Sequence, residues 1–169
     1  MITLDGFPQN KDKYIRLFEF FNEILDICND LNITPILDGS LAVFAYTRNR
    51  DMDVNDIDTS VPEAEFPRLI KILEEKEISY KLQAWHVLQV LKGDLKIELG
   101  SAEYYLENLP KDYQALQIGD YRIKVLSLST LREFYKRSME ARAEGTEEND
   151  KIKYERLKVK YEALNSAKP

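Results

Sequence analysis

The chain of 169 residues is 44% hydrophobic and 32% charged, and its net charge at pH 7 is −6. This length supports a substantial hydrophobic core, so we expect a single domain over residues 1–169. The acidic balance, without a dense block of basic residues, argues against a protein that binds long nucleic acid. The one cysteine, Cys28, excludes a disulfide framework and a cysteine-based metal site. The sequence has no secretory leader pattern and no apolar run of membrane-spanning length, which indicates a cytoplasmic protein without a membrane partner.

Helices and strands are predicted to alternate in the first half of the chain. Residues 11–30 carry apolar side chains at helical spacing, which predicts an amphipathic helix. Residues 33–37 are apolar and end at the turn "DGS", so they predict a buried strand followed by a short helix over 40–47. Alternating polar and apolar residues predict a strand over 56–61. The segment "EAEFPRLIKILEEKE", which prolines bracket at its start, predicts the next helix.

The second half of the chain favours hairpins and then helices. After the strand-like run "SYKLQ", two Gly-Asp turns at 93–94 and 119–120 each connect a pair of strand-like runs, which predicts two β-hairpins. Thr130 and Glu133 have the spacing of a capping box and predict a helix start at this point. After a glycine break, "NDKIKYERLKVKYEALN" predicts a final charged helix. These elements together predict an α+β fold, with a mixed β-sheet flanked by helices and with C-terminal helices.

Four aspartates stand close together in the run "DMDVNDID". A run rich in Asp and Asn is usually a solvated loop, and this is the alternative that we favour for Asp51 and Asp53. A calcium loop of the EF-hand type is excluded, because it needs Gly where Asp56 stands and Glu where Pro62 stands. Asp56 and Asp58 differ from the other two because a predicted strand begins there. Their side chains would share one face of that strand, and the apolar residue between them would point into the core.

Asp56 and Asp58 therefore form a candidate metal-binding pair. Two neighbouring carboxylates raise each other's proton affinity unless a cation lies between them. Magnesium suits such a pair, because one or two carboxylates hold it and water and substrate phosphates complete its ligands. A third acid would complete a two-metal site for phosphoryl transfer. Glu98 is the candidate, because it stands between the apolar Ile97 and Leu99. The alternative is that Glu98 is a solvent-facing residue of its hairpin.

Gly39 and Ser40 stand where a predicted strand ends and a predicted helix begins. The backbone N–H groups at a helix N-terminus stabilise an anion. Glycine would let a phosphate approach closely, and the Ser40 hydroxyl would donate a hydrogen bond to it. The alternative is ordinary capping of the helix by Asp38 or Ser40. Together with an Asp-x-Asp strand further along the chain, the Gly-Ser pair indicates one site that combines a phosphate with a metal ion.

The order "DGS", short helix, arginine-containing connection and "DID" resembles the nucleotidyltransferase superfamily, whose catalytic fold is like that of DNA polymerase β. Within it, the chain is most similar to small single-domain enzymes such as the lincosamide nucleotidyltransferases. These enzymes show a comparable gap between the glycine pair and the first aspartate. The resemblance spans most of the chain, from about residue 15 to about residue 160, and its specific elements are Gly-Ser and Asp-x-Asp.

The resemblance implies a role for each residue of these motifs. Gly39 and Ser40 would hold a nucleoside triphosphate, and Asp56 and Asp58 would bind Mg²⁺. Glu98 would be the third carboxylate, either as a metal ligand or as the base for an acceptor hydroxyl.

Three basic residues are further candidates for contacts with the nucleotide. Arg48 and Arg50 lie in the connection before the Asp-x-Asp strand, from which they could reach a phosphate. Lys151 follows Asp150 in the C-terminal helical region, where related chains often carry a basic residue next to an aspartate.

The function implied is a magnesium-dependent transfer of a nucleoside monophosphate from an NTP, with ATP as the expected donor, to a hydroxyl acceptor. The acceptor would be a small molecule or a protein, and pyrophosphate would be released. The alternative is a nucleotide-binding or partner-binding module on the same fold without turnover, such as a component of a toxin–antitoxin system. A plain structural domain with an acidic loop is a third interpretation. A homodimer that completes the cleft is a further hypothesis.

Overall fold

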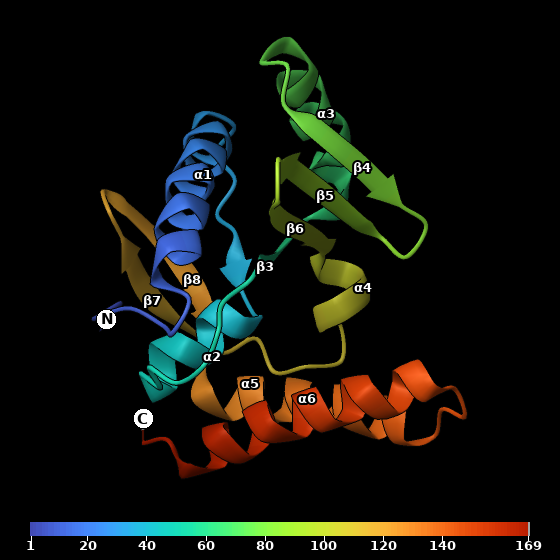
Figure 1. The fold of residues 1–169 in the computed structure, drawn as a ribbon. Helices are drawn as coiled ribbons and strands as arrows, with labels where there is room; N and C mark the ends of the chain where they lie inside the picture. Colours follow the sequence, from blue (N-terminus) through green and yellow to red (C-terminus); the bar gives the residue numbers. More distant parts are fainter. Residues whose placement is uncertain (169) are drawn as a thin grey trace.

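The computed structural model describes residues 1–168, whose strands form one mixed sheet in the order β1-β7-β8-β2-β3-β6-β5-β4 (Figure 1). Its strands are β1 (Ile2–Thr3), β2 (Ile36–Leu37), β3 (Ile57–Val61), β4 (Ser79–Gln83), β5 (Val87–Lys92), β6 (Leu95–Ser101), β7 (Tyr113–Ile118) and β8 (Tyr121–Leu126). Its helices are α1 (Lys11–Asp30), α2 (Ser40–Thr47), α3 (Phe66–Glu75), α4 (Ala102–Leu106), α5 (Leu128–Ala143) and α6 (Glu148–Ser166), and the 3-10 turn η1 (Glu63–Glu65) precedes α3. The predicted α+β fold with a mixed sheet and C-terminal helices is confirmed.

The helices lie in two groups around this sheet. Figure 1 shows α5 and α6 packed side by side at one end of the molecule, away from α1 and α3. On the side of α1, the core includes Leu17, Phe21 and Ile24, which are at most 1% exposed. Burying one such side chain stabilises the folded state by about 1.5–3 kcal/mol relative to leaving it exposed. Within residues 1–168, no helix combines the length and the apolar character that crossing a membrane requires.

β3 and β6 pair in parallel in the interior of the sheet, and their register decides which side chains share a face. Ile57 is opposite Ile97, and Asp58 is opposite Glu98. Because successive side chains of a strand point to opposite faces, both isoleucines point to one face and both acids to the other. The isoleucines are fully buried. The acids therefore face the side on which α5 and α6 lie.

Both predicted hairpins are present. β5 pairs with β6, and β7 pairs with β8, each in antiparallel register. Gly93 and Gly119 occupy the two turns with φ of +59° and +55°. Glycine adopts this left-handed conformation without the steric cost that a Cβ brings, which is why the Gly-Asp pairs mark the turns correctly.

Several elements differ from their predicted bounds. The strand expected over 33–37 is only Ile36–Leu37, because Pro35 has no N–H group to donate to the ladder. The helix expected from Glu63 begins as the 3-10 turn η1, and its α-helical part starts at Phe66. β1 and α4 were not predicted, since elements of two and five residues are too short to show a hydrophobic period.

The predicted capping box at the start of α5 is wrong. The helix begins at Leu128, so Thr130 lies inside its first turn. Ser127 is the N-cap residue, and its Oγ accepts a hydrogen bond from the backbone N–H of Thr130 at 3.3 Å. The Ser127 hydroxyl also donates to Oγ1 of Thr130 at 3.0 Å. The buried serine, three residues before the threonine, therefore takes the capping role that the spacing had assigned to Thr130.

This cap predicts a difference between two neighbouring serines. We expect Ser127→Ala to lower the free energy of unfolding by about 1 kcal/mol, because an N–H group of the first turn loses its acceptor. Ser129→Ala should change it less, because the exposed Ser129 hydroxyl lies 3.2 Å from Oγ of Ser127 but accepts no backbone N–H of the helix. Urea unfolding followed by circular dichroism measures both values. Equal losses would contradict Ser127 as the cap.

Candidate active site

The N-terminus of α2 and the strand β3 approach each other without room for a side chain between them. Gly39 is the N-cap residue of α2, with a φ of −95°. A Cβ built on Gly39 would lie 2.3 Å from Oδ2 and 2.6 Å from Cβ of Asp58. Position 39 therefore requires glycine for the sake of space and not for its backbone conformation. From the sequence we expect this glycine to make room for a phosphate, whereas in the structure it makes room for the Asp58 carboxylate.

Hydrogen bonds extend this contact between β2 and β3. The N–H of Asp38 donates to the carbonyl oxygen of Asp58 at 3.2 Å. The Ser60 hydroxyl donates to Oδ2 of Asp38 at 2.6 Å. Asp38 is 5% exposed, and burial raises its pKa to about 6, although the hydrogen bond from Ser60 acts in the opposite direction. Asp38 thus supports the backbone at this junction and adds a further acidic group next to Asp58.

Three acids converge on one side of the sheet. Asp58 and Glu98 face each other across the β3–β6 pair, and Asp56 directly precedes β3. The Lys96 Nζ lies 3.4 Å from Oδ2 of Asp56 and 3.0 Å from Oε1 of Glu98, so it bridges these two acids. Gln89 also donates from Nε2 to Oε1 of Glu98 at 3.0 Å. The structure thus brings together the three acids that the sequence analysis selected.

This concentration of negative charge changes the proton affinity of the central acid. The pKa of Asp58 lies well above its ordinary value because burial disfavours its charged form and because Asp56 and Glu98 add negative charge nearby. Burial lowers the pKa of the Lys96 ammonium, but the hydrogen bond and the charges of Glu98 and Asp56 outweigh it, and the net shift is upward. The acids therefore require positive charge close to them, and Lys96 supplies part of it.

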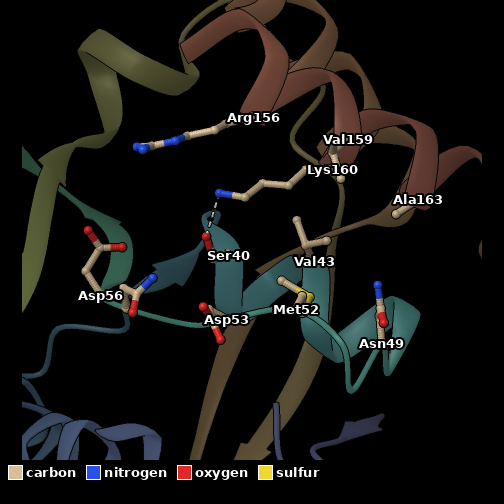
Figure 2. Close-up of a pocket in the computed structure, with 11 residues that line it drawn as sticks. Ser40, Val43, Asn49, Met52, Asp53, Asp56, Arg156, Val159, Lys160 and Ala163 are labelled. Atoms are coloured by element: carbon tan, nitrogen blue, oxygen red, sulfur yellow. Dashed lines mark hydrogen bonds between the residues drawn. The ribbon is translucent and has the colours of Figure 1, made fainter. Parts of the chain in front are cut away.

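A lysine from α6 closes the opposite side of the cleft. The Lys160 Nζ donates to Oγ of Ser40, the first residue of α2, at 2.8 Å (Figure 2). Burial lowers the pKa of Lys160, and the charges of Asp58 and Asp56 oppose this effect. Arg156 lies one helical turn earlier and points into the same space in Figure 2. Two cations of α6 thus face the N-terminus of α2.

Two adjoining cavities meet at these residues. The first has a volume of about 580 Å³ and is lined by Ser40, Val43, Asn49, Met52, Asp53, Asn55, Asp56, Arg156, Val159, Lys160 and Ala163. The second has a volume of about 360 Å³ and is lined by Asp38, Gly39, Asp58, Thr59, Ser60, Trp85, Val87, Glu98, Gly100, Tyr105, Phe134, Tyr135, Arg142, Leu157 and Lys160. Lys160 belongs to both. The two cavities together form one cleft. The first cavity is its more polar half, and the second is rich in aromatic side chains.

The three predicted basic residues lie outside both cavities. Arg48 ends α2 and lies 3.4 Å from the carboxylate of Asp5. The side chain of Arg50 lies against Gly6. Lys151 is exposed in the first turn of α6. The cations that line the cleft come instead from later turns of that helix.

Arg156 and Lys160 were missed by the sequence analysis, although the pattern contains a signal. Residues 156, 159, 160 and 163 all line the first cavity, and this spacing describes one face of a helix. Read as a helical face, "RLKVKYEA" therefore presents two cations and two small apolar residues to one side. This face is not evident in the sequence, because charged side chains also cover most of the other sides of the helix.

The acids fit Mg²⁺ by the chemistry of their donor atoms. Within residues 1–168, no group of three His, Cys, Asp or Glu side chains is close enough together to hold a metal ion. Magnesium does not need such a group, since one or two carboxylates suffice when water and substrate phosphates supply its other ligands. Asp56 and Asp58 offer oxygen atoms only, which are the ligands that Mg²⁺ prefers.

Solved structures share this fold at low sequence identity. The antibiotic-resistance factor ANT(2'')-Ia superposes with a TM-score of 0.61 at 16% identity, over 90% of each chain, and it has also been solved in complex with adenylyl-2''-tobramycin. The lincomycin-bound lincosamide antibiotic adenylyltransferase LnuA gives a TM-score of 0.56 at 15% identity, over 86% of this chain and 94% of LnuA. An antigenic nucleotidyltransferase-like protein from Paracoccidioides brasiliensis gives a TM-score of 0.58 at 12% identity, over 88% of this chain and 74% of the other.

The close packing at position 39 predicts an energetic coupling. We expect Gly39→Ala to lower the free energy of unfolding by about 1–3 kcal/mol, because its Cβ overlaps the Asp58 side chain. In an Asp58→Gly background the same substitution should cost much less, since the three nearest atoms to that Cβ all belong to Asp58. Urea unfolding of the four proteins gives the coupling energy. Equal costs in both backgrounds would show that another contact is responsible.

Neither a protein-family model nor a curated protein matches the sequence of this chain significantly. The likeness to solved structures therefore shows the fold, and the chain has the fold of the nucleotidyltransferases, as the sequence motifs indicated.

Proposed function

We propose that this protein is a magnesium-dependent nucleotidyltransferase, which transfers a nucleoside monophosphate from an NTP to the hydroxyl group of a small acceptor and releases pyrophosphate. One observation carries the proposal. The helix N-terminus with Ser40 and Lys160 lies directly beside a strand pair that presents Asp56, Asp58 and Glu98. An anion-binding end and a cation-binding end in one cleft are what a metal-bound triphosphate requires.

The first cavity is the proposed site of the triphosphate. The N-terminus of α2 offers backbone N–H groups to an anion, and the Ser40 hydroxyl lies at the same point. Lys160 and Arg156 add positive charge from α6. Because β- and γ-phosphates leave together as pyrophosphate, these two cations would stabilise the charge that develops on the leaving group.

The acids act on the other side of the α-phosphate. When bound by Asp56 and Asp58, Mg²⁺ would neutralise the triphosphate and polarise the phosphorus that is attacked. Glu98 lies opposite Asp58 on the wall of the second cavity, where it serves as a further ligand or accepts the proton of the acceptor hydroxyl. The hydroxyl oxygen then forms a bond to the α-phosphorus, and the bond between this phosphorus and the bridging oxygen to the β-phosphate breaks.

The second cavity is the proposed site of the acceptor. Its volume of about 360 Å³ suits a small molecule. Trp85, Tyr105 and Phe134 line it with aromatic surface, and Glu98 lies at its boundary with the carboxylate pair. ATP is the proposed donor for two reasons. ANT(2'')-Ia has been solved with adenylyl-2''-tobramycin, and LnuA is an adenylyltransferase.

A non-catalytic nucleotide- or partner-binding module, such as a component of a toxin–antitoxin system, is the second candidate. One observation favours it, namely that Lys96 already occupies the position between Asp56 and Glu98. A protein that had lost its metal could retain the acids with a lysine as their partner. Nucleotide binding without pyrophosphate release over a broad panel of hydroxyl acceptors would support this candidate and exclude the enzyme.

The carboxylate pair gives the direct test of the enzymatic proposal. We expect calorimetric titration with ATP to show binding that depends on Mg²⁺. Asp56→Asn and Asp58→Asn should each lower pyrophosphate release at least about 100-fold, because the proposed metal ligands lose their charge. An exposed acid on α3, replaced in Glu75→Gln, is the control with the same change of charge. Absence of magnesium-dependent nucleotide binding in the unaltered protein would overturn the proposal.

Lys160 gives a second test, which is specific to the triphosphate. We expect Lys160→Met to weaken Mg-ATP binding about 10- to 100-fold, since a hydrogen-bonded charge on the phosphates is lost. Lys158→Met removes the same charge from an exposed position of the same helix and should leave the affinity unchanged. Calorimetry measures both affinities. If the two variants bind Mg-ATP equally well, Lys160 does not contact the nucleotide.

A further inference from the structure

Lys96 occupies a position that the proposed reaction does not use. It lies two residues before Glu98 on β6, so both side chains share the face of the sheet that carries the acids. Its Nζ lies 3.4 Å from Oδ2 of Asp56 and 3.0 Å from Oε1 of Glu98. A single ammonium group thus contacts Asp56, a proposed metal ligand, and Glu98, the third acid of the site.

The register of the sheet makes this contact a built feature of the fold. β3 and β6 pair in parallel with Asp58 opposite Glu98. Asp56 directly precedes β3, and Lys96 lies next to Ile97, the partner of Ile57, so the ammonium of Lys96 lies 3.4 Å from the carboxylate of Asp56. A lysine at position 96 therefore has an acid beside it on its own strand and another on the neighbouring strand. The positive charge of Lys96 reduces the repulsion between the carboxylates of Asp56 and Glu98.

A divalent cation and this ammonium would compete for the same oxygen atoms. Asp56 is a proposed ligand, and its Oδ2 is the atom that Lys96 approaches. A metal ion at this carboxylate would lie within a few ångströms of the ammonium, where two positive charges repel strongly. Both cations therefore cannot keep these positions at once. The lysine has room to leave, since its side chain is 37% exposed and flexible.

We propose that Lys96 is the internal counter-cation of Asp56 and Glu98, and that Mg²⁺ must displace it from Asp56 when it binds. The inference rests on the proposed function in one respect, namely that Asp56 and Asp58 bind the metal. Its consequence is that the protein alone holds Mg²⁺ weakly. The metal enters together with the triphosphate, whose negative charge attracts the released ammonium and compensates for its lost partners.

The test measures the affinity for Mg²⁺ alone, without nucleotide. Calorimetric titration with MgCl₂ compares the unaltered protein with Lys96→Met, which keeps the apolar stem, and with Lys96→Arg, which keeps the charge. A charge within about 4–6 Å changes the proton affinity of a carboxylate roughly 10- to 1,000-fold, and the same Coulomb repulsion opposes the binding of Mg²⁺ beside an ammonium group. We therefore expect Lys96→Met to bind Mg²⁺ at least about 10-fold more tightly than the unaltered protein. Lys96→Arg should bind it as weakly as the unaltered protein.

Lys71→Met is the matched control, because Lys71 is exposed on α3 and lines neither cavity. It makes the same change in net charge and should leave the affinity for Mg²⁺ unchanged. Lys96→Gln is a second variant in case the methionine disturbs folding. Thermal unfolding gives an independent readout, since a ligand that binds only the folded state raises the melting temperature. The rise on adding MgCl₂ should be larger for Lys96→Met and Lys96→Gln than for the unaltered protein.

The results separate this inference from the proposed function. Unchanged or weaker Mg²⁺ binding in both Lys96→Met and Lys96→Gln would overturn the inference, even if the unaltered protein releases pyrophosphate from Mg-ATP. Tighter Mg²⁺ binding in these variants would support the inference, even if no acceptor leads to pyrophosphate release. A tenfold gain in Lys71→Met would also overturn it, because the effect would then come from net charge and not from position.

Discussion

The contact between Gly39 and the side chain of Asp58 is the constraint on which the arrangement of the cleft depends. It leaves no space for a Cβ, so the N-terminus of α2 lies directly against the acidic strand β3. The bonds that link Asp38 to the backbone of Asp58 and to Ser60 hold the same junction from the side of β2. The N-terminus of α2, which attracts anions, and the acids of β3, which attract cations, are therefore packed directly against each other.

The charges of the cleft are balanced by cations from separate elements. Lys96 on β6 lies among the acids, and Lys160 on α6 lies at Ser40. A buried polar group is costly unless it is hydrogen-bonded, so the bond from Lys160 to Ser40 favours the position of α6 against α2. That helix has one fully buried side chain, Leu164, and Arg132 donates to the carbonyl oxygens of Leu164 and Ala167 near its end. The position of α6 thus depends on a few specific polar contacts as well as on packing.

Helices and strands were predicted correctly where the local sequence pattern is strong. The helices over 11–30 and 40–47 have the predicted bounds, because an amphipathic period and a turn mark them. The two Gly-Asp hairpins follow from the left-handed conformation of their glycines. β1 and α4 contain too few residues to show a period, and Ser127 caps α5 although the capping-box spacing pointed to Thr130. The elements that were missed are thus too short to show a period, and the misplaced cap lies three residues from the predicted one.

The sequence by itself determined the fold class, the Gly-Ser pair and the Asp-x-Asp pair, because each of these is carried by a local pattern of residues, whereas the register of β3 and β6 brought Glu98 to them. Only the tertiary structure decided which cations face them. Lys160 meets Ser40 across 120 positions of sequence, and Lys96 meets Asp56 only through the parallel register of β3 and β6. No local period encodes such a meeting. It follows from how strands pair and how a helix packs, whereas Arg48, Arg50 and Lys151, which the sequence favoured for their nearness to the motifs, lie outside both cavities.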